Sequence, residues 1–242
     1  MQLTNFRKSY QLIICLLVGA ALHAQGQTFT RQDSLRGSLN AERTWWDVLR
    51  YDISVTPDYN SKTIAGEVNL GFKVVSEAGP MQIDLQEPMN LTTATLNGKS
   101  ISFTREGNAW HLAITDKLPL GSRQNIVLAF SGKPREAVRA PWDGGWIWTK
   151  DRGGNPWMTV ACQGLGASVW YPCKDHQSDE PDNGASLRMT VDNDLAAVGN
   201  GRLLSKKDAG QGKTEFLWEV KNPINNYDII PYIGKYSNWN DS

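Results

Sequence analysis

Apolar and polar residues alternate along most of the chain, and this alternation predicts short β-strands. The clearest case is Thr63–Val74, where the even positions are mostly apolar and the odd positions are mostly polar. A period of two places one face of a strand in a core and the other face in water. We therefore expect residues 63–74 to form a long, half-buried strand.

Similar runs recur at short spacing. Asn97 and Gly98 separate two of them, and both residues accept a positive φ, which makes this pair a strong hairpin signal. No amphipathic helix of ten or more residues appears after the N-terminal stretch. Many short strands divided by turn residues predict an all-β fold, an antiparallel β-sandwich. The other predicted strands cover residues 51–56, 82–85, 91–96, 99–103, 110–114, 126–130, 187–191, 216–220 and 227–234.

Composition excludes one class of partner. The 242 residues carry a formal net charge of zero, with a pI near 6.8. Nucleic-acid binding depends on a basic surface, so we expect no nucleic-acid partner. Apolar residues make up 40% of the chain, enough for a packed core.

The first 24 residues have the pattern of a secretory signal peptide. Arg7 and Lys8 precede the apolar run 12–24, which is too short to span a bilayer comfortably. Cleavage after Ala24 predicts an exported protein, periplasmic or secreted, with no membrane attachment. A lipid anchor on Cys15 is disfavoured because bulky Ile14 precedes it. Residues 25–44 read as a polar leader, mobile or forming a short helix.

The stretch Trp157–Asp175 breaks the alternating pattern. Gly164 and Gly166 permit a positive φ or the close approach of another surface. Gln163 lies among small residues, and its amide can both donate and accept hydrogen bonds to a ligand. Cys162 and Cys173 either pair in an oxidising compartment or remain buried thiols, and the sequence leaves both open.

No catalytic or metal-binding motif is recognisable. The sequence lacks H-E-x-x-H, G-x-S-x-G, a phosphate-binding loop and C-x-x-C. The acidic residues from Asp175 to Asp182 lack the ordered spacing of a Ca²⁺ loop, so we expect a solvated turn with Asp175 capping backbone N–H groups. We therefore predict no catalytic residue and no metal site in this chain.

Four tryptophans allow two interpretations. Trp142, Trp146, Trp148 and Trp157 sit among glycines in a long insertion. Exposed indoles would form a flat platform for a glycan or a protein, whereas buried indoles would fill the core beneath the insertion.

At the same residues the chain resembles a known family. Gln163 stands nine residues before Pro172 in a Pro-Cys-x-Asp segment, as a Glu or Gln does in the N-terminal domain of M1 zinc aminopeptidases (the aminopeptidase N and leukotriene A4 hydrolase type). Gly199-Asn200-Gly201 and the segment from Asn226 to Gly234 are similar to later parts of that domain. The resemblance extends from Trp45 to Tyr236.

Three departures from the family pattern affect the loop. Ala161 stands where Gln is frequent, Ser168 where Arg is common, and Asp179-Glu180-Pro181 comes four residues late.

The resemblance implies a fold and a role. It implies a saddle-like β-sandwich over residues 45–236, packed on a thermolysin-like catalytic domain, with residues 237–242 as the start of the linker to that domain. In the family that domain carries the zinc, the H-E-x-x-H motif and the G-x-M-E-N loop, all absent from these 242 residues.

By the same resemblance, Gln163 contacts the N-terminal residue of a peptide substrate. Pro172, Cys173 and Asp175 form the structural anchor that aims it. We therefore expect an N-terminal domain of an exported metallo-aminopeptidase, lining one wall of the substrate cleft and inactive alone. The alternative is a freestanding exported β-sandwich module that binds a glycan or a protein through its tryptophans.

Overall fold

The computed structural model describes residues 28–237, so the predicted signal peptide lies outside the described residues, as does most of the predicted linker. The chain divides into two compact units, Met1–Ser34 and Leu35–Ser242. In the first unit, Thr30 and Asp33 exchange hydrogen bonds at the start of α2 (Arg31–Gly37), a reciprocal cap of the helix N-terminus. No helix in the described residues is long and apolar enough to cross a membrane.

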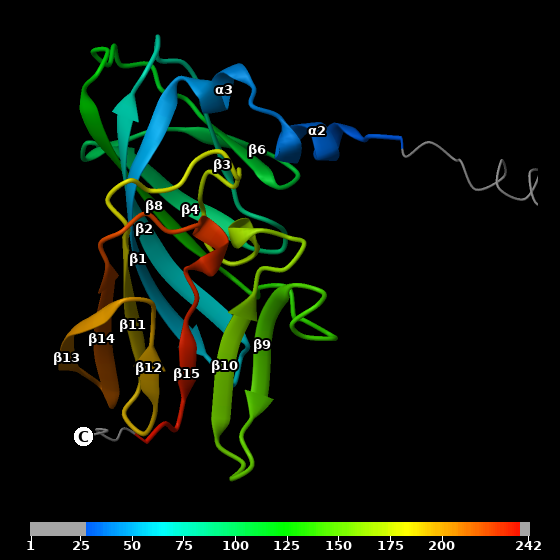
Figure 1. Cartoon of the computed structure of the whole chain (residues 1–242), viewed down its shortest axis with the longest axis vertical. Coiled ribbons are helices and arrows are strands. Elements are labelled where there is room, and N and C mark those ends of the chain that lie inside the picture. The colour runs from blue at the N-terminus through cyan, green and yellow to red at the C-terminus, as the bar shows by residue number, and fades with distance from the viewer. Residues whose placement is uncertain (1–27, 238–242) are drawn as a thin grey trace, which may run out of the picture. The chain divides into compact units, whose positions relative to one another are not determined.

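The second unit contains three sheets (Figure 1). The largest has eight strands in the order β13-β14-β11-β1-β2-β8-β4-β5. Its strands, in chain order, are β1 (Trp46–Asp58), β2 (Thr63–Val74), β4 (Asn90–Leu96), β5 (Lys99–Ser100), β8 (Arg123–Gly132), β11 (Ala185–Asp192), β13 (Arg202–Gly210) and β14 (Lys213–Val220).

Two smaller sheets pack on the same core as the large one. A four-stranded sheet has the order β12-β15-β10-β9 and a three-stranded sheet the order β3-β7-β6. Their strands are β3 (Met81–Asp84), β6 (Phe103–Glu106), β7 (Ala109–Leu112), β9 (Gly145–Lys150), β10 (Pro156–Ala161), β12 (Ala196–Val198) and β15 (Tyr232–Gly234). This layered all-β architecture confirms the predicted β-sandwich.

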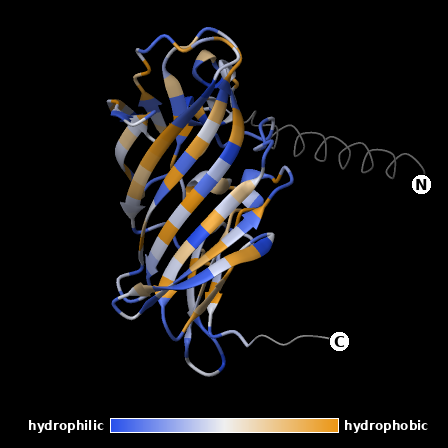
Figure 2. Ribbon diagram, turned by 90° about the vertical axis from the view of Figure 1, so that its left-hand side faces the viewer, coloured by the Kyte–Doolittle hydropathy of each residue, from blue (hydrophilic) through white to orange (hydrophobic). Residues whose placement is uncertain are grey.

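The alternating pattern of Thr63–Val74 is confirmed as β2. Its even-numbered apolar side chains are buried, while Glu67 and Lys73 are exposed. Figure 2 shows the same alternation of apolar and polar residues along the neighbouring strands of the large sheet. The hairpin prediction is also confirmed, since Asn97 (φ 49°) and Gly98 (φ 83°) join β4 to β5.

Some predicted boundaries are wrong. The first strand begins at Trp46 and extends to Asp58, longer than residues 51–56. The last predicted strand, 227–234, is instead a 3₁₀ turn, η2 (Asn226–Asp228), followed by the short β15. One pairing also departs from a purely antiparallel sheet, because β1 and β11 are parallel.

Between residue 28 and the first strand the chain forms two short helices. Besides α2, helix α3 (Ala41–Thr44) lies in the segment predicted as a polar leader, and Asn40 caps it by accepting from the Glu42 N–H. Leu35 is 4% exposed and Arg43 is fully buried. This segment is therefore packed into the second unit from Leu35 onward.

The three sheets share one hydrophobic core. Phe72 on β2 lies at its centre, fully buried, with its ring edge-on to Trp45 at 5.7 Å and to Trp46 at 5.8 Å between centroids. Such aromatic contacts stabilise beyond their buried area.

We expect Phe72→Ala to lower the free energy of unfolding by about 3–5 kcal/mol, because it opens a cavity among rings that cannot collapse into it. Urea denaturation followed by tryptophan fluorescence measures this. The control Leu120→Ala, at a side chain 73% exposed, should cost less than about 0.5 kcal/mol. Equal losses in the two variants would contradict the assignment of the core.

Candidate functional site

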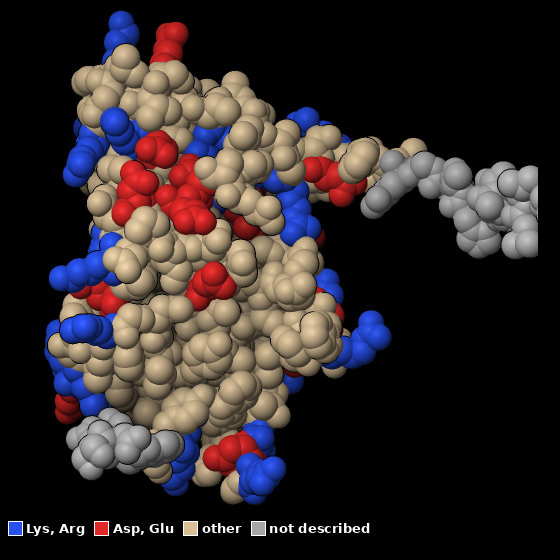
Figure 3. All heavy atoms as spheres, viewed as in Figure 1, with Lys and Arg blue, Asp and Glu red and all other residues tan. Residues whose placement is uncertain are grey.

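The outer face of the four-stranded sheet carries a groove. Along β10 the side chains alternate: Met158 is directed into the core, while Trp157 and Thr159 line the groove. Ile147 of β9 and Tyr232 of β15 flank Thr159 on the two neighbouring strands and also line the groove. The groove has a volume of about 520 Å³. Figure 3 shows mostly uncharged atoms over β9, β10 and β15.

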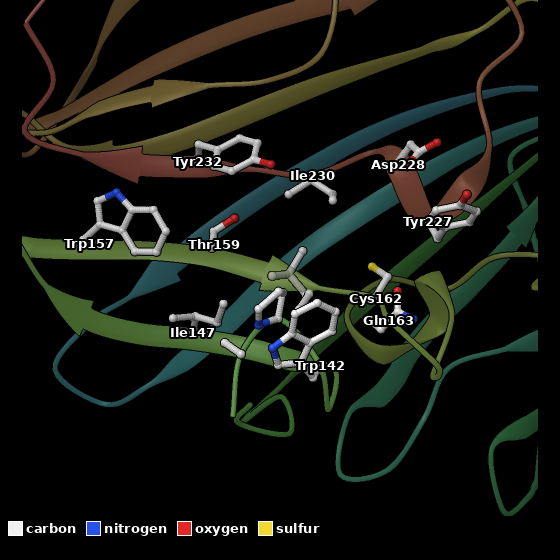
Figure 4. Close-up of a pocket in the computed structure, with 14 residues that line it drawn as sticks. Trp142, Ile147, Trp157, Thr159, Cys162, Gln163, Tyr227, Asp228, Ile230 and Tyr232 are labelled. Carbon is white, nitrogen blue, oxygen red and sulfur yellow. The ribbon is translucent and has the colours of Figure 1, made fainter. Parts of the chain in front are cut away.

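Gln163 lies at one end of this groove, two residues after β10 ends (Figure 4). Its side chain is exposed and has no hydrogen-bond partner among the described residues. Trp157 and Tyr232 lie at the opposite end. The structure therefore brings the predicted contact residue to an apolar groove, although its role in binding a substrate stays a prediction.

A tight turn follows Cys162 and presents Gln163. The Cys162 carbonyl accepts hydrogen bonds from the N–H groups of Leu165 (3.1 Å) and Gly166 (2.8 Å). Gly164 (φ 69°) and Gly166 (φ 84°) both adopt the left-handed region that favours glycine. A Cβ on Gly166 would lie 2.2 Å from an Asp175 carboxylate oxygen, whereas a Cβ on Gly164 would meet nothing within 4 Å.

Asp175 binds the segment that follows this turn. Its carboxylate accepts hydrogen bonds from the N–H groups of Ala167 (3.3 Å) and Ser168 (3.2 Å) and from the Ser168 hydroxyl (2.6 Å). These N–H groups begin the 3₁₀ turn η1 (Ala167–Val169). The expectation that Asp175 caps backbone N–H groups is confirmed.

Cys173 fastens the same segment to the three-stranded sheet. Its backbone forms an isolated antiparallel bridge with Asp84, with bonds of 2.8 and 3.1 Å. Pro172 is buried beside it. These contacts give a physical basis for Pro172, Cys173 and Asp175 as an anchor, while the anchor's effect on Gln163 stays a prediction.

A buried ion pair links this anchor to the helical segment 35–44. Arg43 donates to the Asp84 Oδ2 atom at 2.5 Å, and the same oxygen accepts a hydrogen bond from the Asp175 N–H at 3.0 Å. Arg43 also donates to the carbonyls of Arg36 (2.7 Å) and Ser38 (3.1 Å). Burial raises the pKa of Asp84, and the Arg43 guanidinium opposes that rise.

Arg36 extends this network to the turn that presents Gln163. Its guanidinium donates to the Gly164 carbonyl at 2.7 Å. On the other side, Gln86 donates to the Leu165 carbonyl at 2.6 Å. Two side chains from distant parts of the chain therefore hold the two carbonyls that directly follow Gln163.

Asp179 in the acidic loop takes part in contacts within the fold. Asp179 pairs with Lys174 and accepts the Val48 N–H. Within residues 28–237, no group of three His, Cys, Asp or Glu side chains is arranged to hold a metal ion.

The four tryptophans of the insertion do not form an exposed platform. Trp146 is fully buried, and its ring packs against Trp148 and Trp170. Trp148 and Trp157 are partly buried, and Trp142 alone of the four is exposed, at 78%. Most of this aromatic surface fills the core, so the alternative of a tryptophan-based binding module is not favoured.

Cys162 and Cys173 are buried free thiols, not a disulfide. Burial, followed by the negative charges of Asp175 and Asp228, raises the pKa of Cys162 to about 12. Burial raises the pKa of Cys173 as well.

Solved structures share this fold. An M1 zinc metallopeptidase from Deinococcus radiodurans, in a mutant form, matches with a TM-score of 0.67 and 19% identity over 80% of this chain and 43% of that chain. The mutant bound to a Tyr-Ser-Ala substrate matches with a TM-score of 0.66 and 20% identity over the same shares. Native yeast LTA4 hydrolase matches with a TM-score of 0.64 and 16% identity over 88% of this chain and 32% of that chain. No family model matches the sequence, and no curated protein matches it either.

The chain therefore has the fold of the N-terminal β domain of M1 zinc metallopeptidases, as the sequence resemblance predicts. It spans less than half the length of the solved structures that it matches.

Sequence reasoning missed several residues that shape the site. Asp228 and Tyr227 line the groove from η2, within a segment predicted to be strand. Asn225 and Asn226, which favour turns over strands, were the available signal. Arg36 and Arg43 carried no local signal for their roles at the site, because Gly164 and Asp84, the partners that connect them to it, lie more than 40 residues away in the sequence.

The two glycines of the turn should respond differently to alanine. Both substitutions strain a left-handed residue by about 1–3 kcal/mol, but Gly166→Ala must also displace Asp175 from its cap. We expect Gly166→Ala to lower the unfolding free energy by at least about 1 kcal/mol more than Gly164→Ala does. Chemical denaturation of both variants measures the difference, and equal losses would contradict the close approach of Asp175.

The two buried thiols should be unreactive in the folded chain. With a pKa of about 12, roughly one Cys162 in ten thousand is a thiolate at pH 8, and the thiolate is the nucleophile. Ellman's reagent should label neither Cys162 nor Cys173 at pH 8, and should label both in 6 M guanidinium. Mass spectrometry of tryptic peptides assigns the sites. Rapid native labelling of Cys162 would contradict its burial.

Proposed function

We propose that this chain is the N-terminal domain of an exported zinc aminopeptidase of the M1 family, which releases N-terminal residues from peptides. The domain contributes one wall of the substrate cleft and has no activity alone. The observation that carries the proposal is the position of Gln163: the residue singled out by the family motif lies exposed at the end of an apolar groove, on a fold shared with M1 enzymes.

The solved relatives support the peptide substrate and the domain partner. One is described as a two-domain M1 zinc metallopeptidase, and another holds a Tyr-Ser-Ala substrate. By analogy, the partner of this domain is a thermolysin-like catalytic domain, and the ligand is the N-terminal residue of a peptide.

In this proposal the zinc lies in the partner catalytic domain. Residues 28–237 contain no group of side chains suited to a metal ion, so no catalytic step is assigned to them. What this chain supplies is a contact surface: the Gln163 amide accepts a hydrogen bond from a substrate ammonium group, and the groove receives apolar parts of the peptide.

Export rests on the N-terminal sequence. The basic residues Arg7 and Lys8 followed by the apolar run 12–24 support a cleaved signal peptide and a periplasmic or secreted location. The two free thiols are compatible with either location, because the fold does not depend on a disulfide.

The proposal predicts how activity divides between domains. Residues 25–242, purified alone, should bind less than about 0.1 equivalent of zinc and hydrolyse no aminoacyl-anilide, because the metal ligands and the base lie in the partner domain. The reading frame after the Ser242 codon should continue into an H-E-x-x-H motif.

In the longer protein, Gln163→Ala should raise KM by about tenfold with a smaller effect on kcat, since it removes a contact to bound substrate. Gln177→Ala, a matched change at an exposed glutamine outside the groove, should leave both constants unchanged. Stoichiometric zinc with turnover in residues 25–242 alone would contradict the proposal.

A further inference from the structure

The groove contains a single charged residue among its lining side chains, Asp228. It is exposed, and its carboxylate has no hydrogen bond or ion pair within residues 28–237. Two other carboxylates of this region accept hydrogen bonds from backbone N–H groups. Asp175 caps η1, and Asp143 accepts the N–H groups of Val138 and Arg139 at 2.6 and 2.9 Å. The negative charge of Asp228 is therefore uncompensated in the groove.

Buried contacts fix the position of Asp228. It ends η2, whose first residue, Asn226, is 6% exposed and donates to the Lys174 carbonyl at 2.8 Å. The Asn226 carbonyl in turn accepts from the Tyr171 hydroxyl at 3.0 Å. Because Lys174 directly follows Cys173, η2 is attached to the same segment that supports the turn of Gln163. The backbone turn that carries Asp228 is therefore held in place, while its carboxylate is exposed to the groove.

Asp228 lies at the same end of the groove as Gln163. Figure 4 shows Tyr227, Asp228, Cys162 and Gln163 together at that end. Cys162 lies close enough to Asp228 for the two to interact electrostatically. The negative charges of Asp175 and Asp228 both contribute to the raised pKa of the Cys162 thiol. Arg36, the nearby cation that donates to the Gly164 carbonyl, is not among the lining residues.

Most of the other lining residues are apolar or aromatic. Ile147, Ile230 and Tyr232 line the groove, and Trp142 adds an indole that is 78% exposed. Aromatic rings beside a carboxylate favour organic cations, because the ring face attracts a cation and the carboxylate supplies opposite charge. A neutral amide such as Gln163 can orient an ammonium group without attracting it over distance.

We infer that Asp228 and Gln163 together recognise an organic cation whose apolar body lies along the groove. Asp228 supplies the charge and Gln163 supplies an oriented acceptor. The cation is an ammonium group, either the N-terminus of a peptide or a basic side chain. The identification of the ligand as a peptide rests on the proposed function, whereas the preference for a cation rests on the groove itself.

The test is an NMR titration of residues 25–242 with four probes. L-phenylalaninamide carries a free α-ammonium, and N-acetyl-L-phenylalaninamide lacks it. N-acetyl-L-lysinamide carries a side-chain ammonium, and N-acetyl-L-norleucinamide is its neutral match. Dissociation constants come from the Trp142 indole and Gln163 amide resonances, which also assign binding to the groove.

We expect at least one cationic probe to bind more tightly than its neutral match by about fivefold or more. Asp228→Asn, which keeps the shape and removes the charge, should abolish that difference, and the variant's spectrum verifies its fold. Asp194→Asn, at another exposed aspartate without a partner and outside the groove, should preserve it. Tighter binding of phenylalaninamide identifies the peptide N-terminus as the source, and tighter binding of acetyl-lysinamide identifies a basic side chain.

Three outcomes would overturn the inference. These are no binding of any probe at 20 mM, equal binding of charged and neutral probes, or a preference for cations that survives Asp228→Asn. The result is independent of the zinc and turnover measurements. A cation preference in a chain whose reading frame lacks H-E-x-x-H would refute the proposed function and leave this inference standing. An H-E-x-x-H motif in the reading frame together with no cation preference would refute this inference and leave the proposed function standing.

Discussion

The buried ion pair between Arg43 and Asp84 connects the parts of the molecule on which the candidate site depends. Asp84 belongs to β3, its backbone pairs with Cys173, and its carboxylate receives both Arg43 and the Asp175 N–H. A buried ion pair contributes little net stability when intact, yet loss of one partner leaves an uncompensated charge that is strongly destabilising. The pair therefore couples the three-stranded sheet, the helical segment and the anchor segment, because loss of either partner destabilises the contacts of all three.

The groove follows from how strands divide their side chains. In β10 and its neighbours, one face adds residues such as Met158 and Trp146 to the shared core, which leaves Thr159 and Ile147 on the other face. A sheet edge or loop could not present so broad a surface without exposing backbone groups. The charged residue Asp228 and the amide of Gln163 lie at one end of the groove, where β10 ends and η2 lies.

Much of the fold could be predicted from local pattern. The period of two in β2 and the turn chemistry of Asn97-Gly98 act over a few residues, and both were confirmed. Gly164 and Gly166 also indicated an unusual turn from the sequence alone. Pairings between distant strands had no comparable local sequence signal. The parallel contact of β1 with β11 joins Tyr51 to Ala185, and nothing in either strand's own pattern specifies that partner.

The sequence singled out one residue of the candidate site, Gln163, but it did not predict the residues that surround it. Gln163 stood out through its spacing from Pro172, a relation within one segment. Asp228 did not, because its significance comes from the groove that β9, β10 and η2 build jointly. Trp142 and Trp146 were indistinguishable in sequence, although one is exposed and the other is buried. Burial depends on which face the completed sheet turns inward.

The burial of Arg43 has a practical consequence for dissecting the protein. The sequence pattern alone suggests Trp45 as the first residue of the domain, and a fragment starting there would keep every strand. Such a fragment would nonetheless leave the buried Asp84 carboxylate without the Arg43 guanidinium. It would also remove the hydrogen bond from Arg36 to the Gly164 carbonyl. A fragment that keeps these contacts must begin at or before Leu35, whose carbonyl accepts a hydrogen bond from Gln82.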